Sequence, residues 1–460
     1  MKFSKRTSIT LIFLGVLPVI LQACVSTFSQ FKSKLSAAKF GEVICIANGE
    51  HNDWIMIVKK DGITIMGEEG GKVVMKGRSQ IKIYGSQVKV ANLTFTAPLN
   101  VEGNRRDFPP PIVFDRRAKD SEVFDCVVQN HCANRWARVR GDRTQIHHCL
   151  FKDKPAPVIG IPSEIIYVGD KEMHGISIHH NRLENYDPDA KVMKHKHDGA
   201  EGIYVKVSRN QGRETKDFAT SVHHNYFHKI DAEQETIGIK SSGNEVYENA
   251  IEECFGGISL RHGKRNIVTR NYIQMRQTGD RDNHGITAHD SDHQIVNNWV
   301  MEAGRKAGIQ VTGGNGPTDC NACHVRAKNI QIKSNVLVNS ALVIGRKYPD
   351  NPKTADDYYR PPENIRVADL NSSCSYPFAM IGGTEVCKSK SFLGNPTTFT
   401  GVNEFNGPQL INCGDLTNMQ QLFSSKRIIW KNGAKDLGDY GKQKIKQIKC
   451  GAGPSWYKGC

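Results

Sequence analysis

The stretch Val222-His223-His224-Asn225 returns in altered form as Val246-Tyr247-Glu248-Asn249 and again as Val268-Thr269-Arg270-Asn271. The asparagines that end these three copies are separated by 24 and 22 residues. A short unit repeated at a nearly constant period indicates a solenoid, in which each coil stacks on the one before it. Related units on both sides, some with cysteine at the last position, end at Cys126, Cys149, Asn181, Asn298 and Asn335.

A period of this length with short alternating strands is typical of one coil of a parallel β-helix, and insertions at one corner explain the wider gaps between some copies. Asparagines buried in register would hydrogen-bond to one another and to the turn backbone, and cysteine would fit the same small slot. The leucine spacing of leucine-rich repeats is absent, and helical periodicity is weak. We therefore predict an all-β chain folded as a right-handed parallel β-helix.

A second repeated pattern describes another strand of each coil. In Ile237-Gly238-Ile239-Lys240 and Ile258-Ser259-Leu260-Arg261 the first and third residues are apolar. They should point inward, while the second and fourth residues point to solvent. Adjacent coils are about 4.8 Å apart, which would place Lys240 beside Arg261. The outward row predicted by this pattern contains Lys206, Lys240, Arg261 and His289.

Like charges at such a distance repel one another unless an anion or carboxylates compensate them. Carboxylates stand just upstream of Lys240, at Asp231, Glu233 and Glu235. The whole chain is also basic, with a net charge of +15 and a pI near 9.2. A basic protein attracts polyanions, which include nucleic acids, anionic membranes and acidic polysaccharides. The row therefore indicates an anion-binding surface on the outside of one sheet.

The N-terminus has the pattern of an export signal. Lys2, Lys5 and Arg6 precede an apolar run over residues 9–21, which ends in Leu21-Gln22-Ala23-Cys24. This ending is typical of a bacterial lipoprotein, with removal of residues 1–23 and a lipid anchor on Cys24; the alternative is an ordinary signal peptide. We expect an exported protein held at the cell envelope by the anchor, or otherwise periplasmic or secreted. Export makes nucleic acid a poor candidate for the ligand.

Three further segments follow the signal peptide in the predicted organisation. Residues 24–40 form a tether and N-terminal cap, 41–345 a catalytic β-helix, and 346–460 further coils and a disulfide-rich cap. The chain has 13 cysteines, of which twelve remain if Cys24 carries lipid, and an even number in an exported protein suggests disulfides. Their pairing is not readable from the sequence. Cys320 and Cys323 favour a loop disulfide over zinc, because no second cysteine pair stands at the required distance.

The residues around the predicted anionic surface resemble a known family. Glu233-Gln234-Glu235-Thr236-Ile237-Gly238-Ile239-Lys240, followed one coil later by Arg261-His262-Gly263, resembles the core motif of polysaccharide lyase family 6. That family contains alginate lyases and chondroitinase B. The likeness runs from about residue 40 to about residue 345, and Gly41–Gly49 resembles the opening coil of the family. It implies a right-handed β-helix, a calcium ion at the active site and cleavage by β-elimination.

The resemblance also implies roles for single residues. Lys240 falls on the Brønsted base of the family and Arg261 on its Brønsted acid. Glu233 and Glu235 fall on two calcium ligands, and Asp198 stands where the family has an asparagine as the third. Calcium prefers oxygen ligands, so a carboxylate there would still serve. The residues expected to bind substrate are Lys206, His262 and His289.

One departure concerns the coil after Arg261. Many alginate lyases of the family have an arginine in a Gly-Gly-Ile-Arg sequence there, whereas this chain has His284-Gly285-Ile286-Thr287. The missing arginine bears on the substrate and leaves the elimination chemistry in place. Alginate, in particular poly-mannuronate, is the leading substrate, and a glycosaminoglycan such as dermatan sulfate is the alternative.

Elimination removes the C5 proton of a uronate and expels the oxygen at C4. A cation on the neighbouring carboxylate stabilises the charge that develops, which explains an acidic cluster beside a basic surface.

Two other classes of function remain open. A β-helix lipoprotein that binds polysaccharide without cleaving it would not need the Glu–Lys–Arg set together. A glycoside hydrolase would need a pair of carboxylates across the bond, and an epimerase would change the sugars without shortening the chain. We expect a monomer.

Overall fold

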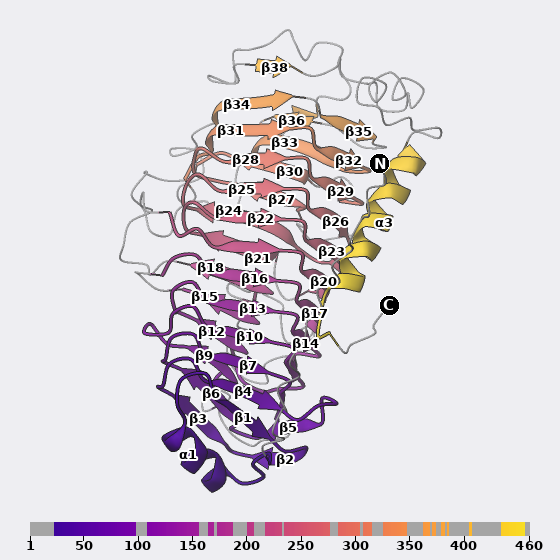
Figure 1. The fold of residues 1–460 in the computed structure, drawn as a ribbon. Coiled ribbons are helices and arrows are strands. Elements are labelled where there is room, and N and C mark those ends of the chain that lie inside the picture. Colours follow the sequence, from indigo (N-terminus) through magenta and orange to yellow (C-terminus); the bar gives the residue numbers. More distant parts are fainter. Residues whose placement is uncertain are drawn as a thin grey trace, which may run out of the picture.

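The computed structural model is a parallel β-helix in which each coil passes through three sheets, called A, B and C here (Figure 1). Within each sheet the strand number rises by three from one neighbour to the next over most of its length. Each strand therefore pairs with the strand one coil later, and these pairs are parallel. The predicted solenoid is confirmed. The structure describes residues 23–97, 108–155, 164–169, 173–186, 200–206, 217–231, 234–276, 284–303, 307–314, 325–346, 362–368, 370–373, 379–381, 384–385, 404–406 and 434–455.

The strands of the three sheets have the following bounds in the described part of the chain. Sheet A consists of β1 (Val43–Ile46), β4 (Thr64–Gly67), β7 (Lys89–Ala91), β10 (Glu122–Phe124), β13 (Gln145–His147), β16 (Ser177–His179), β19 (Ser221–His223), β22 (Glu245–Tyr247), β25 (Ile267–Thr269), β28 (Gln294–Val296), β31 (Lys328–Lys333), β34 (Glu363–Ala368) and β38 (Glu404–Asn406). Sheet B consists of β2 (Gly49–Asn52), β5 (Val73–Lys76), β8 (Thr94–Thr96), β11 (Val127–Gln129), β14 (Leu150–Lys152), β17 (Arg182–Tyr186), β20 (Tyr226–Ile230), β23 (Ala250–Cys254), β26 (Tyr272–Met275), β29 (Trp299–Met301), β32 (Val336–Val338) and β35 (Asn371–Ser373). Sheet C consists of β3 (Ile55–Val58), β6 (Gln80–Ile83), β9 (Ile112–Phe114), β12 (Ala137–Val139), β15 (Ile166–Val168), β18 (Ile203–Lys206), β21 (Glu235–Lys240), β24 (Gly257–His262), β27 (Ile286–Ala288), β30 (Ala307–Thr312), β33 (Ala341–Arg346), β36 (Ala379–Ile381) and β37 (Thr384–Glu385).

Asparagines stacked coil upon coil hold the corner between sheets A and B, as the repeat predicts. The backbone N–H and the side-chain amide of Asn225 both donate to Oδ1 of Asn249, at 3.1 and 3.0 Å. Asn249 donates in the same way to Asn271. The amide of Asn225 also donates to the carbonyl of Ile178 on the preceding coil. Each buried amide is thus satisfied by its neighbours, which removes the cost of burying it. Cys126 and Cys149 occupy the same slot earlier in the helix and are buried.

A second polar ladder lies where sheet C passes into sheet A. The N–H of Asn244 donates to Oδ1 of Asn266, and the N–H of Asn266 donates to Nδ1 of His293. His293 in turn contacts the carbonyl of His289 through Nε2, at 2.8 Å. This ladder was not predicted from the sequence, although Asn244 and Asn266 are one period apart. It makes His293 a buried structural histidine.

The N-terminal end of the solenoid is closed by helix α1 (Phe28–Ala37). Thr27 and Gln30 form a capping box that satisfies the first backbone N–H groups of the helix. Phe31 packs on Trp54 of the first coil. Cys24 forms a disulfide with Cys45 in β1. A sulfur in a disulfide does not carry a thioether-linked lipid, so this structure and the predicted anchor on Cys24 exclude each other.

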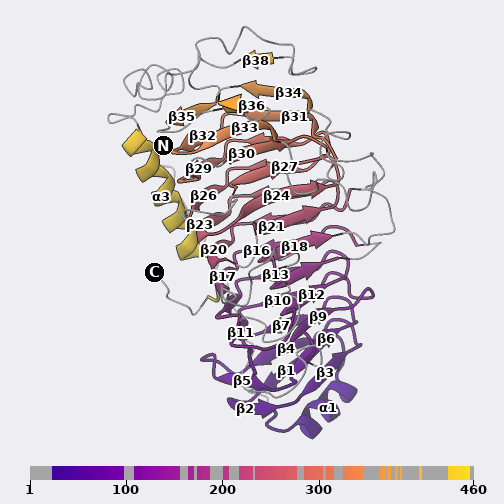
Figure 2. The same ribbon diagram turned by 180° about the vertical axis from the view of Figure 1, so that it is seen from behind.

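The C-terminal region adds further coils and then a helix. Strands β34, β36 and β38 extend the solenoid beyond residue 345. Helix α3 (Ala434–Gly451), which the sequence analysis did not anticipate, lies along the outer face of sheet B from β20 to β32 (Figures 1 and 2). Tyr440 packs on Trp299, and Ile445 is buried against the sheet. No helix in the described part of the chain is long and apolar enough to cross a membrane.

The described cysteines fall into two groups. Cys24, Cys45 and Cys450 are disulfide-bonded. Cys126, Cys149 and Cys254 are buried thiols, so the even count that predicted disulfides does not apply to them. Cys320 and Cys323 lie outside the described residues.

Candidate active site

Sheet C has the inward apolar residues that the sequence pattern predicts, but the expectation that the second residue of each pattern faces solvent is wrong, because Tyr204 is 3% and Ser259 4% exposed and Gly238 is buried. Ile237 and Ile239 of β21 are fully buried, while Lys240 is half-buried at the surface. The register aligns Tyr204, Gly238 and Ser259 in one outward row. These three buried residues therefore lie side by side on three neighbouring coils.

A β-bulge changes the predicted neighbour of Lys240. The pairing of β21 with β24 skips one residue after Leu260, so that Lys240 pairs with His262 and not with Arg261. Arg261 is the extra residue of the bulge, and its Nη1 lies 3.6 Å from Oε1 of Glu235. The expectation that Lys240 and Arg261 are register partners is wrong. The bulge re-aims the Arg261 side chain toward the start of the preceding strand, as bulges next to active sites do.

Two ammonium groups share the ring of Tyr204. The Nζ atom of Lys240 lies 4.6 Å from the ring centroid, and Nζ of Lys206 lies 5.3 Å from it. Both distances fit cation–π contacts, which offset part of the repulsion between two like charges on adjacent coils. Lys206 and Lys240 are register partners, as the sequence pattern predicts. Tyr204 itself was not identified as a site residue.

Three buried carboxylates line the start of the same strands. Glu164, Glu201 and Glu235 each stand two residues before the first inward isoleucine of their strands, β15, β18 and β21. Arg135 donates to Glu164 from Nε at 2.7 Å, and Ser259 donates to Oε1 of Glu235 at 3.1 Å. Burial raises the pKa of the Tyr204 phenol well above its usual range, and the nearby carboxylates, Glu201 first, raise this pKa further. Neither Glu164 nor Glu201 was predicted from the sequence as a site residue.

Gly238 makes room for one of these carboxylates. A Cβ atom at this position would lie 2.8 Å from Oε2 of Glu235, 3.0 Å from the Tyr204 ring and 3.3 Å from Cγ of Glu201. Oε2 of Glu235 is buried and has no hydrogen-bond partner among the described residues. A buried carboxylate oxygen without a partner is costly. An oxygen-preferring cation such as calcium would satisfy it, so Glu235 and its surroundings fit such an ion.

The remaining predicted site residues are placed as follows. Asp198 and Glu233, the other two predicted calcium ligands, lie outside the described residues. His262 is half-buried at the surface beside Lys240. His289 is only 2% exposed, and its Nδ1 contacts Oγ1 of Thr312 at 2.7 Å, so the expectation that it points to solvent is wrong. Asp231, expected as a counter-charge of the lysines, is ion-paired with Arg276.

The fold and this surface define a class: parallel β-helix proteins whose outer sheet carries a Glu–Lys–Arg constellation. The model of the chondroitinase B family matches residues 25–354 of this chain. The chain therefore belongs to the chondroitinase B family, and so to the polysaccharide lyases that act on uronate-containing polysaccharides. No match to a curated protein sequence was found.

Solved structures share the fold at low sequence identity. A mannuronic-acid-specific family 6 polysaccharide lyase from the human gut microbiota has a TM-score of 0.67 and 19% identity, over 93% of this chain and 95% of that one. The polysaccharide lyase Pedsa3628 of Pseudopedobacter saltans has a TM-score of 0.63 and 19% identity, over 84% and 96%. The family 6 alginate lyase AlyGC has a TM-score of 0.61 and 22% identity, over 77% and 50%. The β-helix thus matches these lyases over most of its length.

Proposed function

We propose that this protein cleaves alginate, with a preference for mannuronate-rich chains, by calcium-assisted β-elimination. The observation that carries the proposal is the single surface on which Lys240, Tyr204, Glu235 and Arg261 meet. Family membership supports the elimination chemistry. The mannuronic acid specificity of a lyase that matches nearly the whole chain supports the substrate.

Lys240 is the base of the proposed reaction. Its Nζ takes the C5 proton of the uronate, the C5–H electrons form the C4–C5 double bond, and the bond from C4 to the glycosidic oxygen breaks. Lys240 must be neutral to accept the proton. The Tyr204 ring positions Nζ of Lys240, which lies 4.6 Å from the ring centroid. A positioned base of this kind contributes about 10²–10⁴-fold to a rate.

Arg261 completes the reaction on the leaving group. An arginine side chain stays protonated in proteins, so its guanidinium stabilises the negative charge that develops on the glycosidic oxygen. Glu235 holds this guanidinium, because Nη1 and Oε1 are 3.6 Å apart. The leaving oxygen takes its proton from water or from His262, which stands in register with Lys240.

Calcium would be held by Glu235 together with Glu233 and Asp198. When bound, the ion neutralises the uronate carboxylate, which makes the C5 proton more acidic. Glu201 lies beside Glu235 around Gly238 and adds negative charge to the same place. Lys206 and His262 would contact the polyanionic substrate. The buried Oε2 of Glu235 supports this assignment.

A glycosaminoglycan such as dermatan sulfate is the second candidate substrate. The family takes its description from chondroitinase B. Thr287 stands in the outward row next to Ser259, where an arginine would hold a uronate carboxylate of alginate. A sulfated chain would rely more on Lys206 and Lys240. Binding of a polysaccharide without cleavage is the remaining alternative, and it would survive Lys240→Ala.

The deciding experiment is the ultraviolet absorbance of the unsaturated uronyl end. The purified mature protein is incubated with poly-mannuronate, poly-guluronate and dermatan sulfate, first with calcium and then with a chelator. A rise on poly-mannuronate that Lys240→Ala abolishes is the expected result. A rise on dermatan sulfate alone would change the substrate. Binding without any rise would overturn the enzymatic proposal for these polymers.

We also propose that the protein is exported and acts as a monomer. The N-terminal charged and apolar segments support export. The Cys24–Cys45 disulfide fits an oxidising compartment. Under this proposal Cys24 links the N-terminal cap to β1 through its disulfide with Cys45. Retention of the protein at the cell envelope would then need another attachment.

A further inference from the structure

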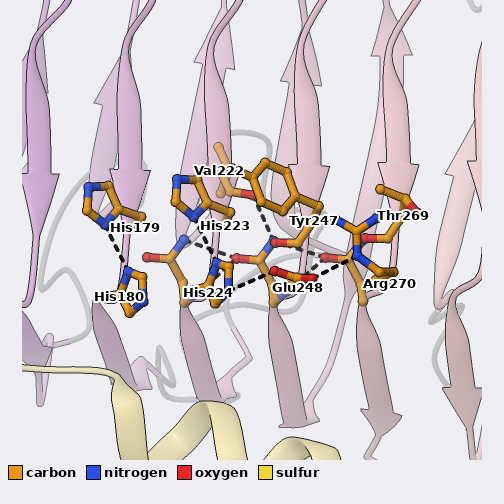
Figure 3. Close-up of polar contacts among 12 residues, drawn as sticks. His179, His180, Val222, His223, His224, Tyr247, Glu248, Thr269 and Arg270 are labelled. Atoms are coloured by element: carbon orange, nitrogen blue, oxygen red, sulfur yellow. Dashed lines mark hydrogen bonds and ion pairs between the residues drawn. The ribbon is translucent and has the colours of Figure 1, made fainter. Parts of the chain in front are cut away.

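Six histidines form two stacked columns on three successive coils, at the corner where sheet A passes into sheet B. Figure 3 shows four of them, His179, His180, His223 and His224. Rings within the first column are parallel, with centroids 4.9 and 4.8 Å apart. Rings within the second column are 4.9 and 4.7 Å apart. All six side chains are half-buried. The first column consists of His147, His179 and His223, and the second of His148, His180 and His224.

The corner geometry brings the two columns together. His179 ends β16 and His223 ends β19 in register, so their side chains leave adjacent strands on the same face. His180 and His224 follow in the left-handed region, with φ of 53° and 54°. This turn lets two consecutive side chains project on the same side before the buried asparagine of the corner. As a result Nδ1 of His179 lies 2.9 Å from Nδ1 of His180.

In each close pair, His179 with His180 and His223 with His224, at least one of the two facing nitrogens is unprotonated and so carries a free lone pair. A contact of 2.9 Å between two imidazole nitrogens is a hydrogen bond, and one of the two must lack a proton. Burial first, and neighbouring imidazoles second, lower the pKa of His179 to about 3 and the pKa values of His180 and His223 to about 4. Neutral imidazole is the form that binds metal ions.

We propose that His179, His180 and His223 bind one divalent transition-metal ion, of the class of Zn²⁺, Ni²⁺ or Cu²⁺. One nitrogen from each of the three rings lies within 4.8 Å of the other two. Metal–nitrogen bonds of about 2.0–2.1 Å place two neighbouring ligands roughly 3 Å apart. The His179–His180 pair already has this spacing. An all-imidazole set suits these ions, whereas calcium prefers oxygen.

The far nitrogens of these rings are held by neighbouring polar groups. Nε2 of His179 contacts Oε1 of Gln145 at 3.2 Å, and Nε2 of His223 contacts Oγ of Ser177 at 3.2 Å. Such outer contacts orient metal-binding histidines. The backbone of the C-terminal segment also reaches this corner, because the N–H of Gly453 donates to the carbonyl of His180. A bound ion would tie two coils together beneath that segment.

The site is separate from the proposed lyase site. The histidine columns lie on sheet A and its corner, whereas Lys240 and Glu235 lie on sheet C. Figure 3 shows His179 facing His180, and His223 facing His224, along the strand ends. Ring stacking alone would explain parallel rings. Stacking within a column does not explain why Nδ1 of His180 approaches Nδ1 of His179, or why Nδ1 of His224 approaches Nδ1 of His223.

The test uses replacements that the same columns already contain. Phe124 stacks on His147 in the first column, so His179→Phe should keep the stack. Asn92 and Asn297 occupy the left-handed position of the second column, so His180→Asn should keep the turn. Untagged mature protein is titrated with Zn²⁺, Ni²⁺, Cu²⁺ and Ca²⁺ by calorimetry, and thermal unfolding is followed with and without each ion.

We expect saturable one-to-one binding of at least one of the three transition ions and a rise in Tm on binding. Each single variant should fold, lose at least about tenfold in affinity and lose the rise in Tm. The control His195→Ala/His197→Ala removes the other clustered histidines of the sequence and should bind as the parent does. The proposal is overturned if the parent binds none of the three ions, if both single variants bind as tightly as the parent, or if the control abolishes binding.

Discussion

The space that a side chain on residue 238 would fill belongs to the carboxylate of Glu235. A Cβ atom on Gly238 would stand 2.8 Å from Oε2 of Glu235. Glu235 begins β21 and Gly238 lies three residues further along the same strand. The glycine is therefore needed for its small size: Gly238 has no positive φ. The proposed calcium ligand depends on a residue that would not itself touch the ion.

Gly238→Ala should weaken calcium binding while the coil stays folded. The added methyl group would push the Glu235 carboxylate away from Tyr204 and Glu201, so we expect the calcium needed for half-maximal activity to rise at least about tenfold. The control is Gly451→Ala, where a Cβ meets nothing within 4 Å. Calcium titrations of activity and of intrinsic fluorescence check the effect. An unchanged calcium requirement with full activity would remove Glu235 from the metal site.

Lys240→Arg separates proton abstraction from polyanion binding. Arginine keeps the positive charge but does not give up its proton at ordinary pH. We expect substrate binding to persist and turnover to fall by about 10²-fold or more. Lys82 offers a matched control, because its Nζ lies 4.8 Å from the Tyr84 ring on the same sheet. Lys82→Arg should change turnover by less than a few-fold, as absorbance assays on the same uronan would show.

The repeat made the architecture predictable, because each coil must place the same residue types at the same corner. Asn225, Asn249 and Asn271 are one period apart in the sequence and bonded in sequence order in the structure. The alternation in sheet C likewise predicted the neighbours Lys206 and Lys240. These features are periodic, so they are visible in a single sequence.

Departures from the period were not predictable in the same way. The bulge at Arg261 depends on how two strands pair, and strict alternation does not contain it. His289 continues the alternating pattern in the sequence, yet it is buried with Thr312 where the strand has ended. Tyr440, Ile445 and Ile448 of helix α3 pack on sheet B. These few apolar residues stand among many lysines, so their helical spacing was not recognised in the sequence. Glu201 could have been found from its place two residues before the inward isoleucine.

The Cys24–Cys45 disulfide should be present in the mature protein. It closes a loop of 21 residues in sequence, for which the chain-entropy model gives about 3 kcal/mol of stabilisation. We expect Cys24→Ser/Cys45→Ser to speed hydrogen exchange in α1 and β1 and to leave the central coils unchanged. Intact mass under non-reducing conditions checks the bond directly. A diacylglycerol-modified Cys24 in material from the native host would instead establish the lipid anchor.

His293 should make the protein sensitive to acid. Burial lowers its pKa from 6.5 to about 4, although the contacts with His289 and Asn266 act in the opposite direction. In the neutral ring the proton stands on Nε2, because Nδ1 accepts from the N–H of Asn266 and Nε2 contacts the carbonyl of His289. In the unfolded chain His293 takes up a proton as the pH falls below 6.5, whereas in the folded chain it stays neutral until about pH 4. The stability that His293 contributes is therefore full above pH 6.5 and is lost as the pH falls toward 4. The loss amounts to about 3 kcal/mol.

His293→Asn tests this directly, because Asn266 and Asn244 already occupy the same ladder position on the two preceding coils. The variant should unfold at nearly the same denaturant concentration as the parent at pH 7.5. At pH 4.5 it should be the more stable of the two, since an asparagine does not titrate. Denaturation midpoints at several pH values between 4 and 8 measure the difference. Parallel pH profiles for the two proteins would mean that His293 takes up its proton equally in the folded and unfolded chain, contrary to its burial.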